Sequence, residues 1–199
     1  MLALVVLPAI IEWRLHAEEP VFVFGTTVVI PSGLKGLVYD ISPLTTRLTD
    51  LTKARPRGAI YTSSLNIQPQ DYSLGFPGIT DRVEWFAIDY SGRFWIDTPG
   101  SYRFDLTSDD GALLYIDDLL VIDNNGIHPP TTLRGSIRAG RGIHTIRVSY
   151  FQGPKYFVAL VLKVSGPDEK KFRIFNTEEF KPPPNPDSWE LPARPILGK

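Results

Sequence analysis

The chain has 199 residues, of which 43% are apolar, and this length is typical of one globular domain or of one domain with extensions. The formal net charge of -1 excludes a strong overall attraction to nucleic acid or to acidic membranes. The absence of cysteine excludes a disulfide framework, a thiolate metal site and a cysteine nucleophile. Its prolines and glycines, with many short apolar segments between turn residues, favour an all-β protein over a helical one.

The first predicted element is an apolar run from Leu2 to Ile11, which is too short to cross a bilayer as a helix. The run is compatible with the core of a signal peptide. However, Pro8 interrupts it, Glu12 follows it, and no Lys or Arg precedes it. For residues 1–32, an export signal or anchor and an ordinary buried strand therefore stay open as alternatives.

Alternation of apolar and polar residues predicts strands through the middle of the chain, because side chains two apart share one face of a sheet. Glycine-rich breaks such as "DNNG" and "RAGRG" separate these runs at hairpin spacing. The expected fold is an antiparallel β-sandwich or barrel over residues 33–166. Its inward faces are predicted to include three sets in alternating phase, namely Tyr102, Phe104 and Leu106, then His144, Ile146, Val148 and Tyr150, then Val158, Leu160, Leu162 and Val164.

Residues 167–199 are predicted to hold a final strand followed by a proline-rich tail. Proline has no backbone N–H to donate to a sheet, so residues after Pro182 are expected to lie outside the core. A tail of this kind, "KPPPNPDSWELPARPILGK", suits an extended arm or linker. The chain is therefore expected to be a module of a larger protein or assembly.

Five acidic residues occur within the stretch 107–123, without one Lys or Arg among them. Asp117–Asp118 is predicted to form the tip of the hairpin that joins "ALLYI" to "LLVI". Asp109 and Asp110 differ, because they precede a glycine at the start of a strongly apolar strand. Adjacent side chains of a regular strand point to opposite faces, so these carboxylates can approach one ion only where the backbone is irregular, as at a bulge or a cis peptide bond. Calcium is the candidate ion, and carbonyls, an amide or water from a neighbouring loop would have to complete its shell.

The segment 124–167 has the opposite composition, because it contains no Asp or Glu. Its six basic residues are Arg134, Arg138, Arg141, Arg147, Lys155 and Lys163. Pairing between acidic and basic strands is one explanation of this asymmetry. A nucleic-acid surface is the rival explanation, but the basic residues are scattered over several predicted strands and are neutralised overall, so no nucleic-acid partner is predicted.

The stretch "SYRFDLTSDDGALLYIDDLLVIDNNGIH", followed by "LRGSIRAGRGIHTIRVSYFQGP", resembles the PA-fourteen (PA14) domain family. The earlier segments "GLKGLVYD" and "EWFAIDYSGRFWIDTPG" are similar to the opening strand and the Gly-aromatic strand of this family, so the resemblance covers about Gly33 to Val164. It implies an antiparallel β-sandwich or barrel that serves as a noncatalytic module in adhesins, glycosidases and other exported or cell-surface proteins.

In the sugar-binding members of this family, two adjacent aspartates joined by a cis peptide bond hold a calcium ion that binds vicinal sugar hydroxyls. Asp109 and Asp110 occupy the matching positions. The fungal adhesins add an Asn just after a late Tyr-containing strand, where this chain has Gln152, and this departure leaves the completeness of the site open. The resemblance therefore implies metal ligation by Asp109, Asp110 and Gln152, and sugar contacts from Asn124, Gln152 and Lys155.

Two classes of function follow from these observations. The first is a calcium-dependent carbohydrate-binding or adhesion module, secreted or on the cell surface, whose partner is a glycan or polysaccharide. The second is a ligand-free structural or protein–protein interaction domain of a larger exported protein. The Gln152 amide separates them, because an amide directed between the two aspartate carboxylates favours the first and an amide directed at another loop favours the second. Contact with a membrane is expected only through a signal or anchor at the amino terminus.

An enzyme is not expected. The sequence contains no complete nucleophile elbow, phosphate loop or dinucleotide-binding fingerprint. Its three histidines have no spacing that suggests zinc. His144 lies in phase with core residues and is predicted to be a hydrogen-bonded structural histidine, and His128 is predicted to hold the turn that follows Gly126.

Overall fold

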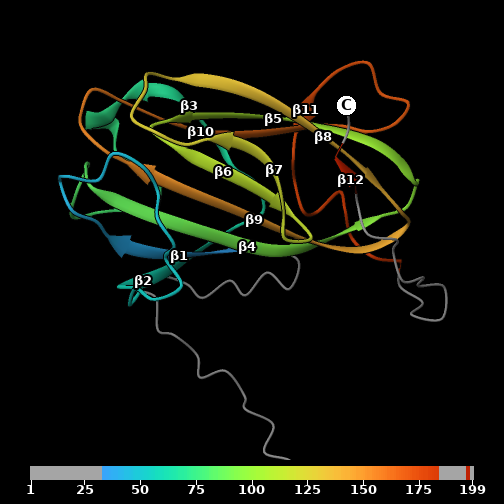
Figure 1. Cartoon of the computed structure of the whole chain (residues 1–199), viewed down its shortest axis with the longest axis horizontal. Coiled ribbons are helices and arrows are strands. Elements are labelled where there is room, and N and C mark those ends of the chain that lie inside the picture. Colours follow the sequence, from blue (N-terminus) through green and yellow to red (C-terminus); the bar gives the residue numbers. More distant parts are fainter. Residues whose placement is uncertain (1–32, 184–195, 198–199) are drawn as a thin grey trace, which may run out of the picture.

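The computed structural model describes residues 33–183 and 196–197, so the expectations for residues 1–32 lie outside the described part of the chain. The described residues form two antiparallel β-sheets packed against each other, which confirms the all-β sandwich (Figure 1). Their one helical element is a short 3-10 turn, Tyr72–Leu74. Within these residues no helix is long and apolar enough to cross a membrane.

The first sheet has the strand order β2-β1-β4-β9-β6-β7. Its strands are β1 (Leu34–Asp40), β2 (Gly58–Thr62), β4 (Phe86–Ile96), β6 (Ala112–Ile116), β7 (Leu119–Asn124) and β9 (Gly142–Gln152). The long strands β4 and β9 pair without interruption from Phe86 opposite Gln152 to Ile96 opposite Gly142. They form the axis of this sheet and lie side by side in Figure 1.

The second sheet has the order β11-β10-β5-β8-β12, and β3 also pairs with β10. Its strands are β3 (Asn66–Asp71), β5 (Gly100–Asp109), β8 (Thr131–Ala139), β10 (Phe157–Ser165), β11 (Arg173–Ile174) and β12 (Ile196–Leu197). One edge of β10 pairs with β5 along most of its length. The other edge pairs with β3 near its start and with β11 near its end.

The core lies between the sheets, and the three predicted inward sets all contribute to it. None of their eleven side chains is more than 6% exposed. Aromatic rings fill one region, where Phe76 stacks on Tyr150 at 5.2 Å between centroids and meets the edge of Phe86. The period-2 pattern therefore predicted the inward faces correctly, because burial of this apolar surface is the main force that joins the sheets.

The hairpin between β6 and β7 has its turn at Asp117 and Asp118, as predicted. Both residues have positive φ, 47° and 64°. Two such residues in succession are typical of the two-residue type I′ turn, whose twist matches the twist of the flanking strands. Aspartate tolerates this conformation better than most residues, so the local sequence suits the turn.

Residues 196–197 of the tail pair with the edge of a sheet, which the expectation that residues after Pro182 lie outside the core left open. β12 lies beyond the last proline, Pro195, and pairs with Arg138 and Ile137 at the edge of β8. Backbone N–H donors are available again once the prolines end, and this permits the pairing. Leu197 is still 53% exposed, so β12 covers a strand edge rather than entering the core.

Basic residues of the segment 124–167 pair with acidic residues from other parts of the chain. Arg134 lies opposite Asp105 in the β5–β8 register, and its Nε donates to the Asp105 carboxylate at 2.6 Å. Lys155 Nζ lies 4.0 Å from a carboxylate oxygen of Glu84. The charge asymmetry of the sequence is therefore partly explained by ion pairing within the fold.

Gly135 allows a close approach between β8 and the edge strand β7. A Cβ atom at this position would lie 2.4 Å from the carbonyl oxygen of Val121. We expect Gly135→Ala to lower the free energy of unfolding by about 1–3 kcal/mol, because one of the two strands must move. Gly58→Ala is the matched control, since a Cβ atom there meets nothing within 4 Å. Urea unfolding tests this prediction, and equal stability of the two variants would contradict it.

Candidate functional site

Three connections between the two sheets lie around Asp109 and Asp110. β5 continues into β6 through Asp110–Gly111, β7 into β8 through residues 125–130, and β9 into β10 through residues 153–156. In each case the chain leaves one sheet and enters the other. Backbone groups that belong to no ladder are thereby concentrated at one place, and such irregular segments on a rigid scaffold commonly carry binding sites.

The Asp110 carboxylate links these connections. Its Oδ1 accepts from the His128 N–H at 3.1 Å, and its Oδ2 accepts from the Gly153 N–H at 2.8 Å. A Cβ atom on Gly153 would lie 2.9 Å from this second oxygen, so glycine is what lets the backbone come so close. Asp110 is only 3% exposed. The carboxylate is therefore held in one orientation by two segments that are remote in the sequence.

Asp109 is also buried, with 5% of its surface exposed. Its peptide bond to Asp110 is cis, as the family resemblance implied. Its carbonyl oxygen lies 2.7 Å from the Tyr150 hydroxyl. No Lys or Arg of the described chain forms an ion pair with either carboxylate, and this is unusual because buried carboxylates are normally paired or bound to metals. The pair is thus a concentration of buried acidic groups with no Lys or Arg of the described chain to balance it.

Electrostatic coupling joins the two carboxylates. Burial, followed by the negative charge of Asp110, raises the pKa of Asp109 to about 7, although a hydrogen bond from Gln152 acts in the opposite direction. Burial also raises the pKa of Asp110, against the lowering effect of the Gly153 and His128 N–H groups. Burial raises both values because it removes water from the charged form.

Gln152 lies beside this pair and is fully buried. Its Nε2 donates to the Phe157 carbonyl at 2.9 Å, and its Oε1 lies 2.6 Å from the Tyr150 hydroxyl. A carbonyl can only accept, so the Phe157 contact requires the nitrogen on that side and turns the oxygen toward Tyr150. In this orientation Gln152 offers Asp109 a hydrogen-bond donor, not a ligating oxygen. Its role as a metal ligand stays a prediction.

Asn124 ends β7 close to the pair and is 4% exposed. Its Nδ2 donates to Ser108 Oγ at 2.8 Å and to the Thr131 carbonyl at 3.0 Å. No donor from the described chain reaches its Oδ1, so this oxygen can still accept from a ligand. Its backbone carbonyl accepts from His128 Nε2 at 2.9 Å. Asn124 therefore contacts the same residue whose N–H donates to Asp110.

Lys155 lies on the β9–β10 connection but makes its contacts elsewhere. Its N–H donates to Glu84 at 2.9 Å, and its Nζ lies 5.7 Å from the centre of the Tyr72 ring. The structure therefore brings Asp109, Asp110 and Gln152 into contact but gives Lys155 other partners. Sugar contact by Asn124 and Lys155 stays a prediction.

Two residues that support the site through hydrogen bonds were not predicted from the sequence. The Tyr150 hydroxyl reaches the Asp109 carbonyl from β9, where the sequence pattern predicted only an inward ring. Asn125 also holds the loop after β1, because its Oδ1 accepts from the Leu48 N–H at 2.8 Å and its Nδ2 donates to the Leu48 carbonyl at 3.2 Å. The "DNNG" turn was visible in the sequence, but its partner 77 residues away was not.

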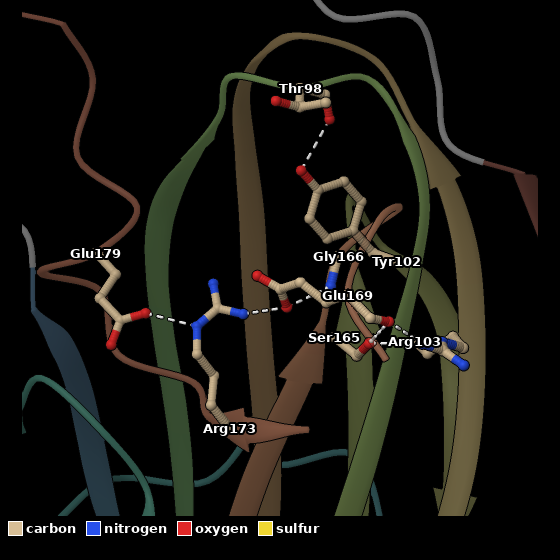
Figure 2. A network of polar contacts seen from close by, with 8 residues as sticks. All are labelled: Thr98, Tyr102, Arg103, Ser165, Gly166, Glu169, Arg173 and Glu179. Carbon is tan, nitrogen blue, oxygen red and sulfur yellow. Dashed lines mark hydrogen bonds and ion pairs between the residues drawn. The ribbon is translucent and has the colours of Figure 1, made fainter. Parts of the chain in front are cut away.

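A second polar cluster lies on the segment that follows β10 (Figure 2). Arg173 lies between two glutamates there, because its Nε donates to Glu179 at 2.8 Å and its guanidinium also bonds to Glu169. Glu169 accepts in turn from the Gly166 N–H at 2.8 Å. These three charged side chains pair with one another. The cluster therefore stabilises the fold of the segment 166–179 and is not a candidate ligand site.

The PA14 domain model matches residues 60–178, which is more than half of the chain, and the chain therefore belongs to the PA14 domain family. A comparison with curated proteins gave no significant match. Solved structures share the fold at low sequence identity.

The PA14 domain of an antifreeze protein superposes with a TM-score of 0.62 at 16% identity, over 74% of this chain and 88% of that one. A PA14 sugar-binding domain from an RTX adhesin superposes with a TM-score of 0.56 at 16% identity, over 73% of this chain and 96% of that one. An anti-sigma factor domain-containing protein superposes with a TM-score of 0.58 at 19% identity, over 77% of this chain. The match spans only 49% of that last protein, about half of its length.

Proposed function

We propose that this protein is a carbohydrate-binding module in which Asp109 and Asp110 hold a calcium ion and sugar hydroxyls complete the shell of that ion. The observation that carries the proposal is the buried pair of adjacent carboxylates without a Lys or Arg partner in the described chain. Two like charges that are removed from water repel each other, and a divalent cation would offset both charges at once.

The donor set suits calcium better than a metal that needs nitrogen or thiolate ligands. The described residues contain no group of three or more His, Cys, Asp or Glu side chains that could hold a metal. Two carboxylates supplemented by neutral oxygens, such as Asn124 Oδ1, backbone carbonyls and water, match the preference of calcium for six to eight oxygen ligands. When bound, calcium would supply open coordination positions for two neighbouring hydroxyls of a sugar.

The residues of the chain have distinct tasks in this proposal. Asp110 is oriented by the His128 and Gly153 N–H groups, so its carboxylate is placed before any ligand arrives. The three inter-sheet connections form the rim around the pair, and Asn124, Gln152 and Lys155 on or beside them are the candidates for selecting the sugar. Such preorganisation lowers the entropic cost of binding.

The solved PA14 domain from the RTX adhesin is itself described as sugar-binding, and this supports a glycan or polysaccharide as the partner. Contact with a single sugar buries few atoms, so each site is expected to bind weakly. Several copies acting together would give useful adhesion. In this proposal the protein is a noncatalytic module of a secreted or cell-surface protein.

Calcium titration tests the proposal directly. Calcium at about one hundred times its dissociation constant should add roughly 2.7 kcal/mol to the free energy of unfolding, which corresponds to a rise of about 5–10 °C in melting temperature for a chain of this size. Magnesium at the same concentration is the control, because it demands a tighter octahedral shell. A glycan array with calcium and with chelator then measures sugar binding. An unchanged melting temperature in millimolar calcium would exclude this mechanism.

One observation favours the alternative function, a ligand-free structural or protein–protein interaction domain. The Gln152 oxygen faces Tyr150 and its nitrogen bonds to Phe157, so the amide serves the fold and not an ion in this arrangement. A protein that binds neither calcium nor any glycan would fit this second function.

A further inference from the structure

The loop between β1 and β2, residues 41–57, packs against the outer face of the first sheet. It covers a small apolar cluster that is separate from the main core. The buried members of this cluster come from three neighbouring strands and are Tyr39 on β1, Ala87 on β4 and Phe151 on β9. The loop contributes Ile41, Leu48 and Leu51. Burial of apolar surface therefore holds the β1–β2 loop on the sheet.

Phe151 extends this packing to the backbone beside the Asp110 carboxylate. Its N–H donates to the Gly111 carbonyl at 2.9 Å, and a Cβ atom on Gly111 would lie 2.4 Å from Cε1 of its ring. A Cβ atom on Gly153 would lie 3.5 Å from Cε2 of the same ring. Gly111 follows Asp110 in the chain, and the Gly153 N–H donates to the Asp110 carboxylate. The cluster that the β1–β2 loop covers therefore lies against both backbone segments.

Asn125 forms a second link between the same loop and the site. It is the first residue of the β7–β8 connection and lies three positions before His128. Its Oδ1 accepts from the Leu48 N–H at 2.8 Å, and its Nδ2 donates to the Leu48 carbonyl at 3.2 Å. Arg47 Nη1 donates to the backbone carbonyl of Asn125 at 3.1 Å. The amide thus joins the start of this connection to a loop that the sheet already holds in place.

The two links reach different donors of the Asp110 carboxylate. Asn125 lies on the connection whose His128 N–H donates to Oδ1 at 3.1 Å. Phe151 lies two residues before Gly153, whose N–H donates to Oδ2 at 2.8 Å. A carboxylate held by two donors keeps one orientation only while both donors stay in place. If the connection lost its tether, it would sample more conformations, and a ligand that needs this orientation would bind more weakly in proportion to the fraction lost.

We propose that Asn125 is a positioning residue of the aspartate site. By joining the β7–β8 connection to the β1–β2 loop, it keeps the His128 N–H in place and so holds the Asp110 carboxylate in the orientation that binds calcium. Asn125 acts through His128, because Leu48 already occupies both ends of its amide. The effect on calcium rests on the proposed function, whereas the effect on His128 is a property of the fold and needs no ion.

Amide hydrogen exchange of the full chain, labelled with ¹⁵N and kept in a calcium chelator, measures the effect on His128. We expect Asn125→Ala to speed exchange of the His128 N–H about fivefold or more, since two hydrogen bonds that restrain its connection are lost. The core N–H of Val148 is the internal reference, because a general loss of stability would speed its exchange as well. Asn125→Asp should lie between wild type and Asn125→Ala, because it keeps the acceptor for the Leu48 N–H and loses the donor. Unchanged exchange at His128, or equal acceleration at Val148, would overturn the positioning role.

Calorimetric titration measures the effect on calcium. Asn125→Ala should raise the calcium dissociation constant about fivefold or more, because fewer molecules hold the carboxylate in its binding orientation. Asn66→Ala is the matched control, since Asn66 lies exposed on β3 and its amide bonds to Gln68, so both calcium affinity and His128 exchange should stay unchanged. Equal calcium affinity of Asn125→Ala and wild type would overturn the link from His128 to the ion. If the wild-type protein binds no calcium, the proposed function fails, and the exchange experiment still decides whether Asn125 positions His128.

Discussion

Replacing Asp109 with asparagine is expected to abolish the calcium-dependent rise in melting temperature and the calcium-dependent glycan signal. The substitution removes one of the two charges that would hold the ion, and calcium affinity depends strongly on the number of charged ligands. The fold should survive, because an amide has almost the same shape as the carboxylate. In the absence of calcium the variant should be as stable as the wild-type protein or more stable, since two like charges no longer repel each other in a buried site.

Asp118→Asn is the matched control for this experiment. Asp118 is also an aspartate of the acidic stretch, but it lies exposed at the tip of the β6–β7 hairpin. Differential scanning fluorimetry of both variants, with calcium and with chelator, measures the effect. The assignment of the ion to this pair would be refuted if calcium stabilised the Asp109→Asn variant as strongly as it stabilises the control.

Asp110→Ala is a less specific test, because the structure gives the Asp110 carboxylate a second role. The substitution would leave the His128 and Gly153 N–H groups without their acceptor. Each buried group left unpaired costs about 1–3 kcal/mol, so this variant should lose stability even without calcium. A loss of sugar binding in Asp110→Ala would therefore have two causes, loss of the ion and loosening of two connections. Asp109→Asn removes only the charge that would hold the ion.

Replacing Asp117 with asparagine is expected to lower the free energy of unfolding by roughly 1.5–3 kcal/mol at pH 5.5, the usual value of a hydrogen bond to a charged group. His144 is 1% exposed, and its Nδ1 lies 2.6 Å from the Asp117 carboxylate. Its Nε2 lies 2.9 Å from the Gly140 carbonyl. Because both ring nitrogens face acceptors, the arrangement favours the doubly protonated, charged imidazole.

The pKa shifts of this pair define the pH at which it stabilises the fold. Burial would lower the pKa of His144, but its bonds to Asp117 and Gly140 prevail and raise it. Its contribution is therefore fully present below the unfolded histidine value of about 6.5 and is lost as the pH rises through the raised folded value. Burial would raise the pKa of Asp117, but the bond from His144 and the Thr145 contacts lower it. This contribution is present above the unfolded aspartate value of about 3.9 and is lost at lower pH.

The pair should therefore stabilise the protein most between about pH 4 and pH 6.5. Urea unfolding at pH 5.5 and at pH 8.5 measures this, and the stability difference between wild type and Asp117→Asn should shrink at the higher pH. Asp118→Asn again serves as the control, because the neighbouring turn position has the same left-handed backbone without the histidine contact. A difference that is constant across this pH range would contradict a charged His144.

The strands of the core could be predicted from the sequence because their pattern is local. Inward and outward side chains alternate along β5, β9 and β10, and each predicted inward set is buried. The turn at Asp117–Asp118 was predictable for the same reason, since a two-residue hairpin depends on the residues it contains. The hydrogen-bonded role of His144 followed from its phase, but its partner Asp117 did not, because the two residues are 27 positions apart.

The candidate site was predicted only in part. The pair Asp109–Asp110 was identified from the acidic motif and the family resemblance. The direction of the Gln152 amide could not be read from the sequence, because Tyr150 and the Phe157 carbonyl determine it.

The sequence by itself determined the alternating strands, the hairpin turns and the place of the acidic pair just before an apolar strand. These features depend on side chains within a few residues of one another, where the period of the strand and the chemistry of the turn residues act directly. Only the tertiary structure decided which connections surround the pair and which oxygens remain available there. The same holds for the pairing of β12 with β8. Each of these depends on how strands distant in the sequence pack, and contact between distant segments has no signature in a local pattern.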